Sequence, residues 1–187
     1  MKAQDIRTGT AIDIDGQTWV VVKYENVKPG KGPAYAQVKM RNVATGSHME
    51  KRLRGAEEVD QVDIDRREME YLYSDGTGAV FMDSETYDQA TIPSSILGEA
   101  MLYVKPNSSV LGLVINGNVV SIELPSAVEL EITETQPAIK GATATNQLKE
   151  AVCETGLKTR VPPFIKEGEV VRISTESGEY LSRVSSS

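Results

Sequence analysis

The sequence is organised around one stretch, Val27-Lys28-Pro29-Gly30-Lys31-Gly32-Pro33-Ala34-Tyr35, in which a lysine stands between two glycines and two prolines. Strand-like runs lie on both sides of it, at residues 18–22 and 36–40. Two such runs joined by a turn-forming segment predict a β-hairpin with Lys31 at its tip. Glycine permits positive φ and close backbone approach, whereas proline fixes φ. We therefore expect the hairpin to hold the lysine out on a stiff stalk.

The alternative for this stretch is an ordinary surface loop, because Pro-Gly and Gly-Pro are common in turns. A phosphate-binding loop of the Walker type is excluded, since that motif requires Ser or Thr after the lysine and Gly32 stands there.

Short strand-like runs separated by turns recur along the chain and predict an all-β fold of sandwiches or small barrels. The strongest hairpin signal is Asn116-Gly117 between two apolar runs. Helical sequence is scarce, and only residues 93–100, which begin with proline, permit a short helix. The length of 187 residues suits three barrels of about 60 residues each.

Composition restricts the chemistry. The chain is 40% apolar and 25% charged, as expected of a globular protein, and no apolar run is long enough to span a membrane. Its start has no apolar secretory core, so we expect a cytoplasmic protein. One cysteine, Cys153, and one histidine, His48, cannot make a zinc site. No nucleophile motif is present, so we expect no catalytic residues, no metal and no enzymatic activity.

Charge is unevenly distributed. Residues 1–63 hold ten Lys/Arg against nine Asp/Glu, residues 64–128 three against nine, and residues 129–187 seven against nine. The basic amino end can meet a structured RNA, while the acidic remainder limits non-specific binding.

Taken together, several segments resemble bacterial translation elongation factor P, in order and over essentially the whole chain. They are the lysine-tipped hairpin, Val120–Pro125, Glu129–Pro137, Glu154–Leu157, Val161–Gly168 and Gly178–Arg183. The resemblance implies three β-barrels in an L shape: an SH3-like (KOW-type) domain at 1–63, and two OB folds at 64–128 and 129–187.

It further implies a factor that binds the 70S ribosome between the P and E sites and relieves stalling at consecutive prolines. Lys31 would lie against the CCA end of the P-site peptidyl-tRNA, flanked by Pro29, Gly30, Gly32 and Pro33, with ribosomal RNA around it. No cofactor is implied. In many relatives a modifying enzyme extends this lysine, for example by β-lysylation. Here Pro33 mirrors Pro29, and we hypothesise that this second proline preorganises the hairpin so that an unmodified lysine suffices.

In the third domain the resemblance implies contacts to tRNA or the E-site mRNA codon from Gly141, Thr143, Asn146, Tyr180 and Arg183. The sequence departs from the family there, because the usual Gly-Asp-Thr reads Gly-Ala-Thr, with Ala142 in place of the carboxylate. For Tyr180 the alternative is a core tyrosine, and for Arg183 a solvated surface residue.

Other functions stay open. The eukaryotic and archaeal class that carries hypusine has two domains, against three expected here. A general RNA-binding OB-fold protein stacks bases on exposed aromatic residues, which supply only 5% of this chain. A paralogue with a different preference among stalling sequences is the closest rival. We expect a monomer that makes no membrane contact.

Overall fold

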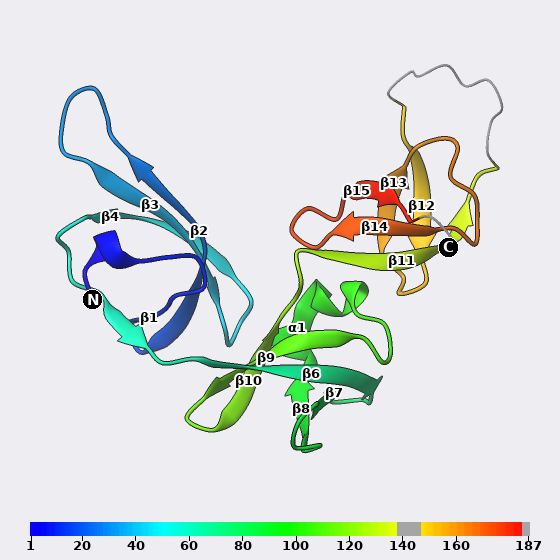
Figure 1. Ribbon diagram of the computed structural model, residues 1–187, viewed down its shortest axis with the longest axis horizontal. Helices are drawn as coiled ribbons and strands as arrows, with labels where there is room; N and C mark the ends of the chain where they lie inside the picture. Colours follow the sequence, from blue (N-terminus) through cyan, green and yellow to red (C-terminus); the bar gives the residue numbers. More distant parts are fainter. Residues whose placement is uncertain (138–146, 185–187) are drawn as a thin grey trace.

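The computed structural model describes residues 1–137 and 147–184. In these residues the strands form three five-stranded sheets, each antiparallel and curled around its own core (Figure 1). The predicted all-β architecture is therefore confirmed. None of the helices in this part of the chain is long and apolar enough to cross a membrane.

The first barrel has the strand order β4-β3-β2-β1-β5. Burial alternates strictly along β3: Ala36, Val38 and Met40 pack in the core of the barrel, and the residues between them face outward. The 3₁₀ turn η1 (Ala3–Asp5) closes one end, and Trp19 packs in the core. The strands are β1 (Ala11–Ile14), β2 (Gln17–Val27), β3 (Tyr35–Asn42), β4 (His48–Arg54) and β5 (Asp60–Val62).

The second barrel has the order β10-β9-β6-β7-β8. Asn116 and Gly117 both have positive φ, at 52° and 81°, and form the predicted tight turn between β9 and β10. The predicted helix is a single turn, α1 (Ser94–Leu97), which continues as the 3₁₀ segment η2 (Gly98–Tyr103). The strands are β6 (Asp65–Ser74), β7 (Gly78–Asp83), β8 (Gln89–Pro93), β9 (Ser109–Ile115) and β10 (Asn118–Glu123).

The third barrel has the order β13-β12-β11-β14-β15. Its central strand β11 pairs with β14 along its first half and with β12 along its second half, with a register shift after Ile132. The long strand thereby joins the two sides of the barrel. The strands are β11 (Ala127–Thr135), β12 (Lys149–Cys153), β13 (Lys158–Val161), β14 (Val170–Ser174) and β15 (Tyr180–Arg183).

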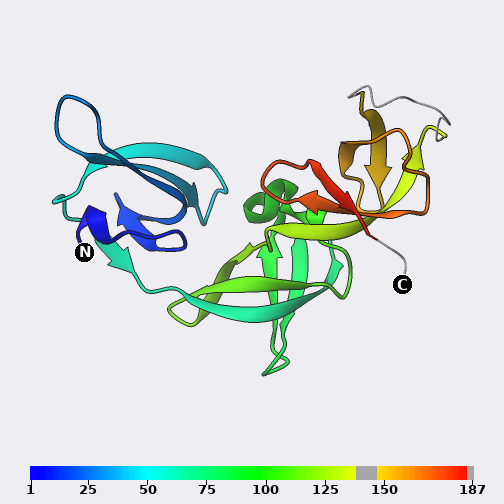
Figure 2. The same ribbon diagram turned by 45° about the horizontal axis from the view of Figure 1, so that its top comes forward.

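The three barrels follow a bent path, with the first and third at opposite ends and the second between them (Figures 1 and 2). The β2–β3 hairpin extends beyond the first barrel, away from the other two (Figure 1). This arrangement places the loop that carries Lys31 at one extremity of the molecule.

Candidate functional site

The β2–β3 hairpin presents Lys31 at its tip. The two strands pair from Trp19↔Asn42 to Val27↔Tyr35, so the paired arms are longer than the sequence predicted. Residues 28–34 connect them and are all exposed. Gly32 has φ +106°, a conformation that side chains strongly disfavour, so this position requires glycine. The backbone therefore turns at the residue that follows the lysine.

Lys31 lacks a carboxylate partner among the residues that the structure describes, where the ion pairs involve other side chains. A Cβ added at either neighbouring glycine would meet nothing within 4 Å. The lysine thus stands on a narrow and uncrowded loop, with three donors on a flexible stem.

An open hollow of about 1020 Å³ lies between this loop and the end of β4. Arg52 and Arg54 contribute to its wall, and the Arg52 guanidinium carbon lies 4.9 Å from the centre of the Tyr35 ring. The complete lining is Pro29, Lys31, Gly32, Pro33, Ala34, Tyr35, Arg52, Leu53, Arg54, Ala56 and Glu57. An anionic ligand that reached the tip would meet cations on both sides of the hollow.

Arg52 and Arg54 also belong to a cationic face on the outer side of β2, β3 and β4, which we define as Lys23, Lys39, Arg52 and Arg54. These residues share one face because Lys23 pairs with Lys39, while the partners of Arg52 and Arg54 lie on the same outward side of β3. Two carboxylates interrupt the face: Glu25, which pairs with Lys23 at 3.1 Å, and Glu50 opposite Lys39.

His48 lies in β4 opposite Arg41, close to the Lys39 end of this face. Burial lowers the pKa of His48 below its ordinary value, and the positive charges of Lys39 and Arg41 lower it further. The surroundings of this imidazole therefore disfavour an additional positive charge.

Tyr180 and Arg183 lie in β15 of the third barrel, far along the bent path from Lys31 (Figure 1). Tyr180 packs partly buried against the core of that barrel, and burial raises its pKa. Arg183 is half exposed; it pairs with Glu169, and its guanidinium lies 5.7 Å from the centre of the Phe164 ring. Gly141, Thr143 and Asn146 lie outside the described residues, as does Ala142.

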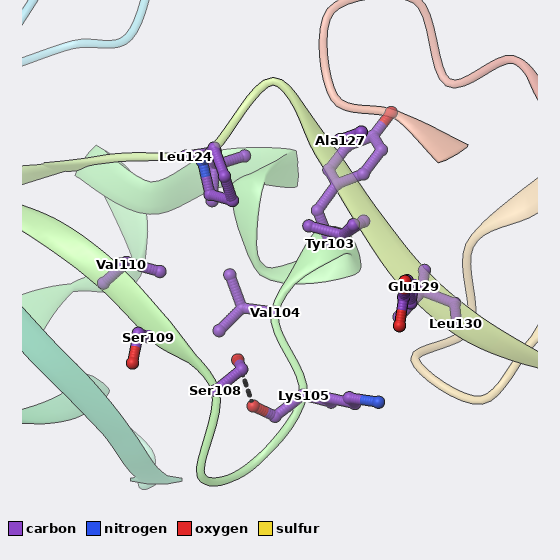
Figure 3. A pocket seen from close by; sticks show the side chains of 12 residues that line it. Tyr103, Val104, Lys105, Ser108, Ser109, Val110, Leu124, Ala127, Glu129 and Leu130 are labelled. Atoms are coloured by element: carbon purple, nitrogen blue, oxygen red, sulfur yellow. Dashed lines mark hydrogen bonds between the residues drawn. The ribbon is translucent and has the colours of Figure 1, made fainter. Parts of the chain in front are cut away.

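A small cleft of about 230 Å³ lies where the second and third barrels meet, and residues of both line it, among them Val104 and Val110 of the second and Ala127 and Leu130 of the third (Figure 3). Across this junction the Thr175 hydroxyl donates to the carbonyl of Pro125 at 2.6 Å. The cleft lies at the junction of the two barrels, and no residue of the β2–β3 hairpin lines it.

The described residues contain no group of three or more His, Cys, Asp and Glu side chains that could hold a metal ion. Sequence reasoning located the basic cluster but not the contact of Arg52 with Tyr35. The two-residue spacing of Arg52 and Arg54, opposite an alternating β3, is the signal that places them on one face.

The fold and the site together define a protein of three small β-barrels that offers a lysine at the tip of its amino-terminal hairpin, beside a cationic sheet face. Three family models match the chain: an elongation factor P KOW-like domain over residues 2–59, an elongation factor P OB domain over 64–122, and an elongation factor P carboxyl-terminal domain over 128–183.

Relatives named elongation factor P match along nearly their whole length. The protein from Moorella thermoacetica is 45% identical over 183 residues, covering 98% of this chain and 99% of its own. The one from Pelotomaculum thermopropionicum is 43% identical, covering 98% of this chain and 100% of its own. A solved structure, the eukaryotic translation initiation factor 5A from Methanococcus jannaschii, covers 67% of this chain and 90% of its own at 24% identity, with a TM-score of 0.46. The chain belongs to the elongation factor P family and is a translation elongation factor.

Proposed function

We propose that this protein binds the 70S ribosome between the P and E sites and relieves stalling at consecutive prolines by positioning the CCA end of the P-site peptidyl-tRNA. The observation that carries the proposal is the exposed Lys31 on an extended hairpin whose sheet carries the cationic face on its outer side. Lysine meets phosphate and ribose oxygens with three donors, and arginines bind phosphate through their planar guanidinium groups.

The mechanism we propose is positional. Proline is a poor nucleophile with a restricted backbone, so bond formation depends on how well the two substrates are aligned. Holding the CCA end in reactive geometry lowers the entropic part of the barrier. The protein itself makes and breaks no bond in this proposal, and ribosomal RNA carries out peptidyl transfer. The site of action is cytoplasmic, and the factor acts as a monomer.

Lys31 works in its unmodified form in this proposal. Gly32 takes the strained turn and Pro33 fixes the next φ, so the loop loses less conformational freedom on binding than a loop without Pro33. The intact mass of the protein purified from its natural host tests this point. A mass equal to that of the sequence supports it, and an added lysyl group contradicts it.

The third barrel contributes a second contact to tRNA or the E-site codon in the proposal, through Tyr180 and Arg183 and through Gly141, Thr143 and Asn146. Because Arg183 is already paired with Glu169, it presents only part of its donor set outward.

The test is a reconstituted translation assay on a tri-proline reporter. We compare the protein with Lys31→Ala, and use Lys28→Ala as the matched control, because Lys28 is also exposed but does not line the hollow. Relief by the unchanged protein and by Lys28→Ala, but not by Lys31→Ala, supports the proposal. Relief by Lys31→Ala contradicts it, and relief only at other stalling sequences identifies a paralogue with a shifted preference.

A further inference from the structure

Arg41 leaves the outer face of β3 and reaches into the second barrel. Its Nη2 donates to the carbonyl oxygen of Ile122 at 3.1 Å, and its Nη1 lies 3.5 Å from the Oγ of Ser121, which is buried. Burial lowers the pKa of the Arg41 guanidinium, and the charge of Glu123 opposes this effect. A cation of the first barrel is thus partly buried against β10 of the second.

A second arginine crosses the same boundary in the opposite direction. Arg66 of β6 donates from Nη2 to the carbonyl oxygen of Gly9 at 2.8 Å, and from Nε and Nη2 to the two carboxylate oxygens of Glu123 at 3.3 Å each. Glu123 therefore lies between a cation from each barrel. Removal of either arginine takes the donors away from acceptors that are partly buried, which costs free energy and favours this one arrangement of the two barrels.

The two arginines border an apolar cluster shared by both barrels. Ala11, Val20 and Val43 from the first barrel and Leu113 from the second are all buried in it. The turn after β3 also approaches α1, since a Cβ at Gly46 would lie 3.6 Å from the carbonyl oxygen of Ile96. Apolar packing, paired charges and a turn contact together oppose rotation of one barrel against the other.

The joint lies at the base of the hairpin that carries Lys31. Val20 is in β2 and Arg41 in β3, and the two are paired across these strands. From Arg41 to Lys31 the chain extends for ten residues, or roughly 30 Å at about 3.3 Å per residue. A rotation of about 5° at the joint displaces the tip by roughly 2.5 Å over that length. Misplacement of a positioned group by about 1 Å can lower a reaction rate on the order of a hundredfold.

We propose that Arg41 is a positioning residue: by locking the first barrel onto β10 it sets the direction of the hairpin and so the location of Lys31. The functional half of this proposal rests on the proposed function, whereas the geometric half stands without it. Arg41 does not touch the tRNA in this account and acts only through the hairpin.

The geometric half is tested on the isolated full-length protein by pulsed electron spin resonance. Spin labels at Lys51→Cys and Glu85→Cys, in a Cys153→Ala background, report the distance between the first and second barrels. We compare Arg41→Met, which keeps an unbranched stem but no donors, with Arg160→Met, an exposed arginine of the third barrel. We expect a broadened or shifted distance distribution for Arg41→Met alone. An unchanged distribution overturns the proposal.

The functional half uses the tri-proline assay over a range of factor concentrations. We expect Arg41→Met to lower the maximal rate at saturating factor by roughly tenfold or more. The half-saturating concentration changes less, because the direction of the hairpin affects alignment of the tRNA and not binding of the factor to the ribosome. Arg41→Lys, which keeps a donor for Ile122, restores part of the rate. A full maximal rate for Arg41→Met overturns the positioning role. If the unchanged protein gives no relief, the proposed function fails, while the spin-label distances still decide whether Arg41 locks the joint.

Discussion

The guanidinium of Arg52 lies over the ring of Tyr35, 4.9 Å from its centre, and connects β4 to the first residue after the Lys31 loop. The two residues are diagonal neighbours on one face, because Arg52 pairs with Gln37 and Tyr35 pairs with Arg54. The contact stabilises the start of β3, where the hairpin loop ends.

Removal of this contact weakens the first barrel. For Arg52→Ala we expect a loss of about 0.5–1 kcal/mol in the free energy of unfolding, the usual contribution of an exposed cation–π pair. Urea unfolding followed by the fluorescence of Trp19 measures it, because this single tryptophan is in the core of that barrel. The control is Lys51→Ala, the preceding exposed residue of the same strand. Equal stability losses in the two variants would contradict a specific contact.

Two glycines of the second barrel, one closely packed and one in open space, allow the cost of crowding to be measured. A Cβ at Gly78 would lie 2.0 Å from the backbone oxygen of Ile92, whereas one at Gly76 would meet nothing within 4 Å. We expect Gly78→Ala to cost about 3 kcal/mol, at the upper end of typical overpacking costs, because the obstacle is backbone. Gly76→Ala serves as the control and keeps the unfolding temperature of the parent in calorimetry. A Gly78→Ala variant as stable as the parent would show that β7 and β8 separate easily.

The single histidine is sensitive to the charges of Lys39 and Arg41. Burial first, and then Lys39 and Arg41, hold the pKa of His48 below 6.5 in the folded protein. Because the unfolded chain takes up this proton first, the contribution of His48 to stability is lost as the pH falls below about 6.5. Proton NMR follows the one imidazole directly. We expect its pKa to rise with added salt, which screens the two cations. A pKa at or above 6.5 in low salt would contradict the inferred field.

Cys153 is protected in the folded protein. It is buried in the third barrel, and burial raises the pKa of its thiol to about 11, with a further contribution from Glu154. The thiolate is the reactive form, so we expect no alkylation by iodoacetamide at pH 8 until that barrel opens. Mass spectrometry with and without urea measures this difference. Alkylation in native buffer at the rate seen in urea would show that the barrel opens readily.

Local signals predicted the parts of the fold that depend on neighbours in sequence. The Asn116-Gly117 turn followed from backbone preference, and the hairpin at residues 27–35 from its glycines and prolines. The loop that carries Lys31 could be predicted from the same glycines and prolines. The confirmed KOW-like and OB architecture followed from the family resemblance, since strand alternation by itself left sandwiches and barrels open.

Contacts that depend on which distant strands lie side by side could not be predicted from the sequence. Arg41 was identified as one of several basic residues, but its burial against Ile122 depends on how β10 lies beside the first barrel. Arg183 was expected to be a solvated residue or an RNA contact; it is exposed, and its ion pair with Glu169 was not foreseen. In both cases the charge was evident from the sequence and its partner was not.

The central claim is that the hairpin brings Lys31 to the CCA end of the P-site tRNA. Directed hydroxyl-radical cleavage tests it most directly, with iron chelate attached through Lys28→Cys so that Lys31 stays intact and the buried Cys153 stays unlabelled. On ribosomes stalled at consecutive prolines, the account predicts cleavage at the 3′-terminal nucleotides of the P-site tRNA. Cleavage confined to other RNA, while the factor remains bound and active, would contradict it.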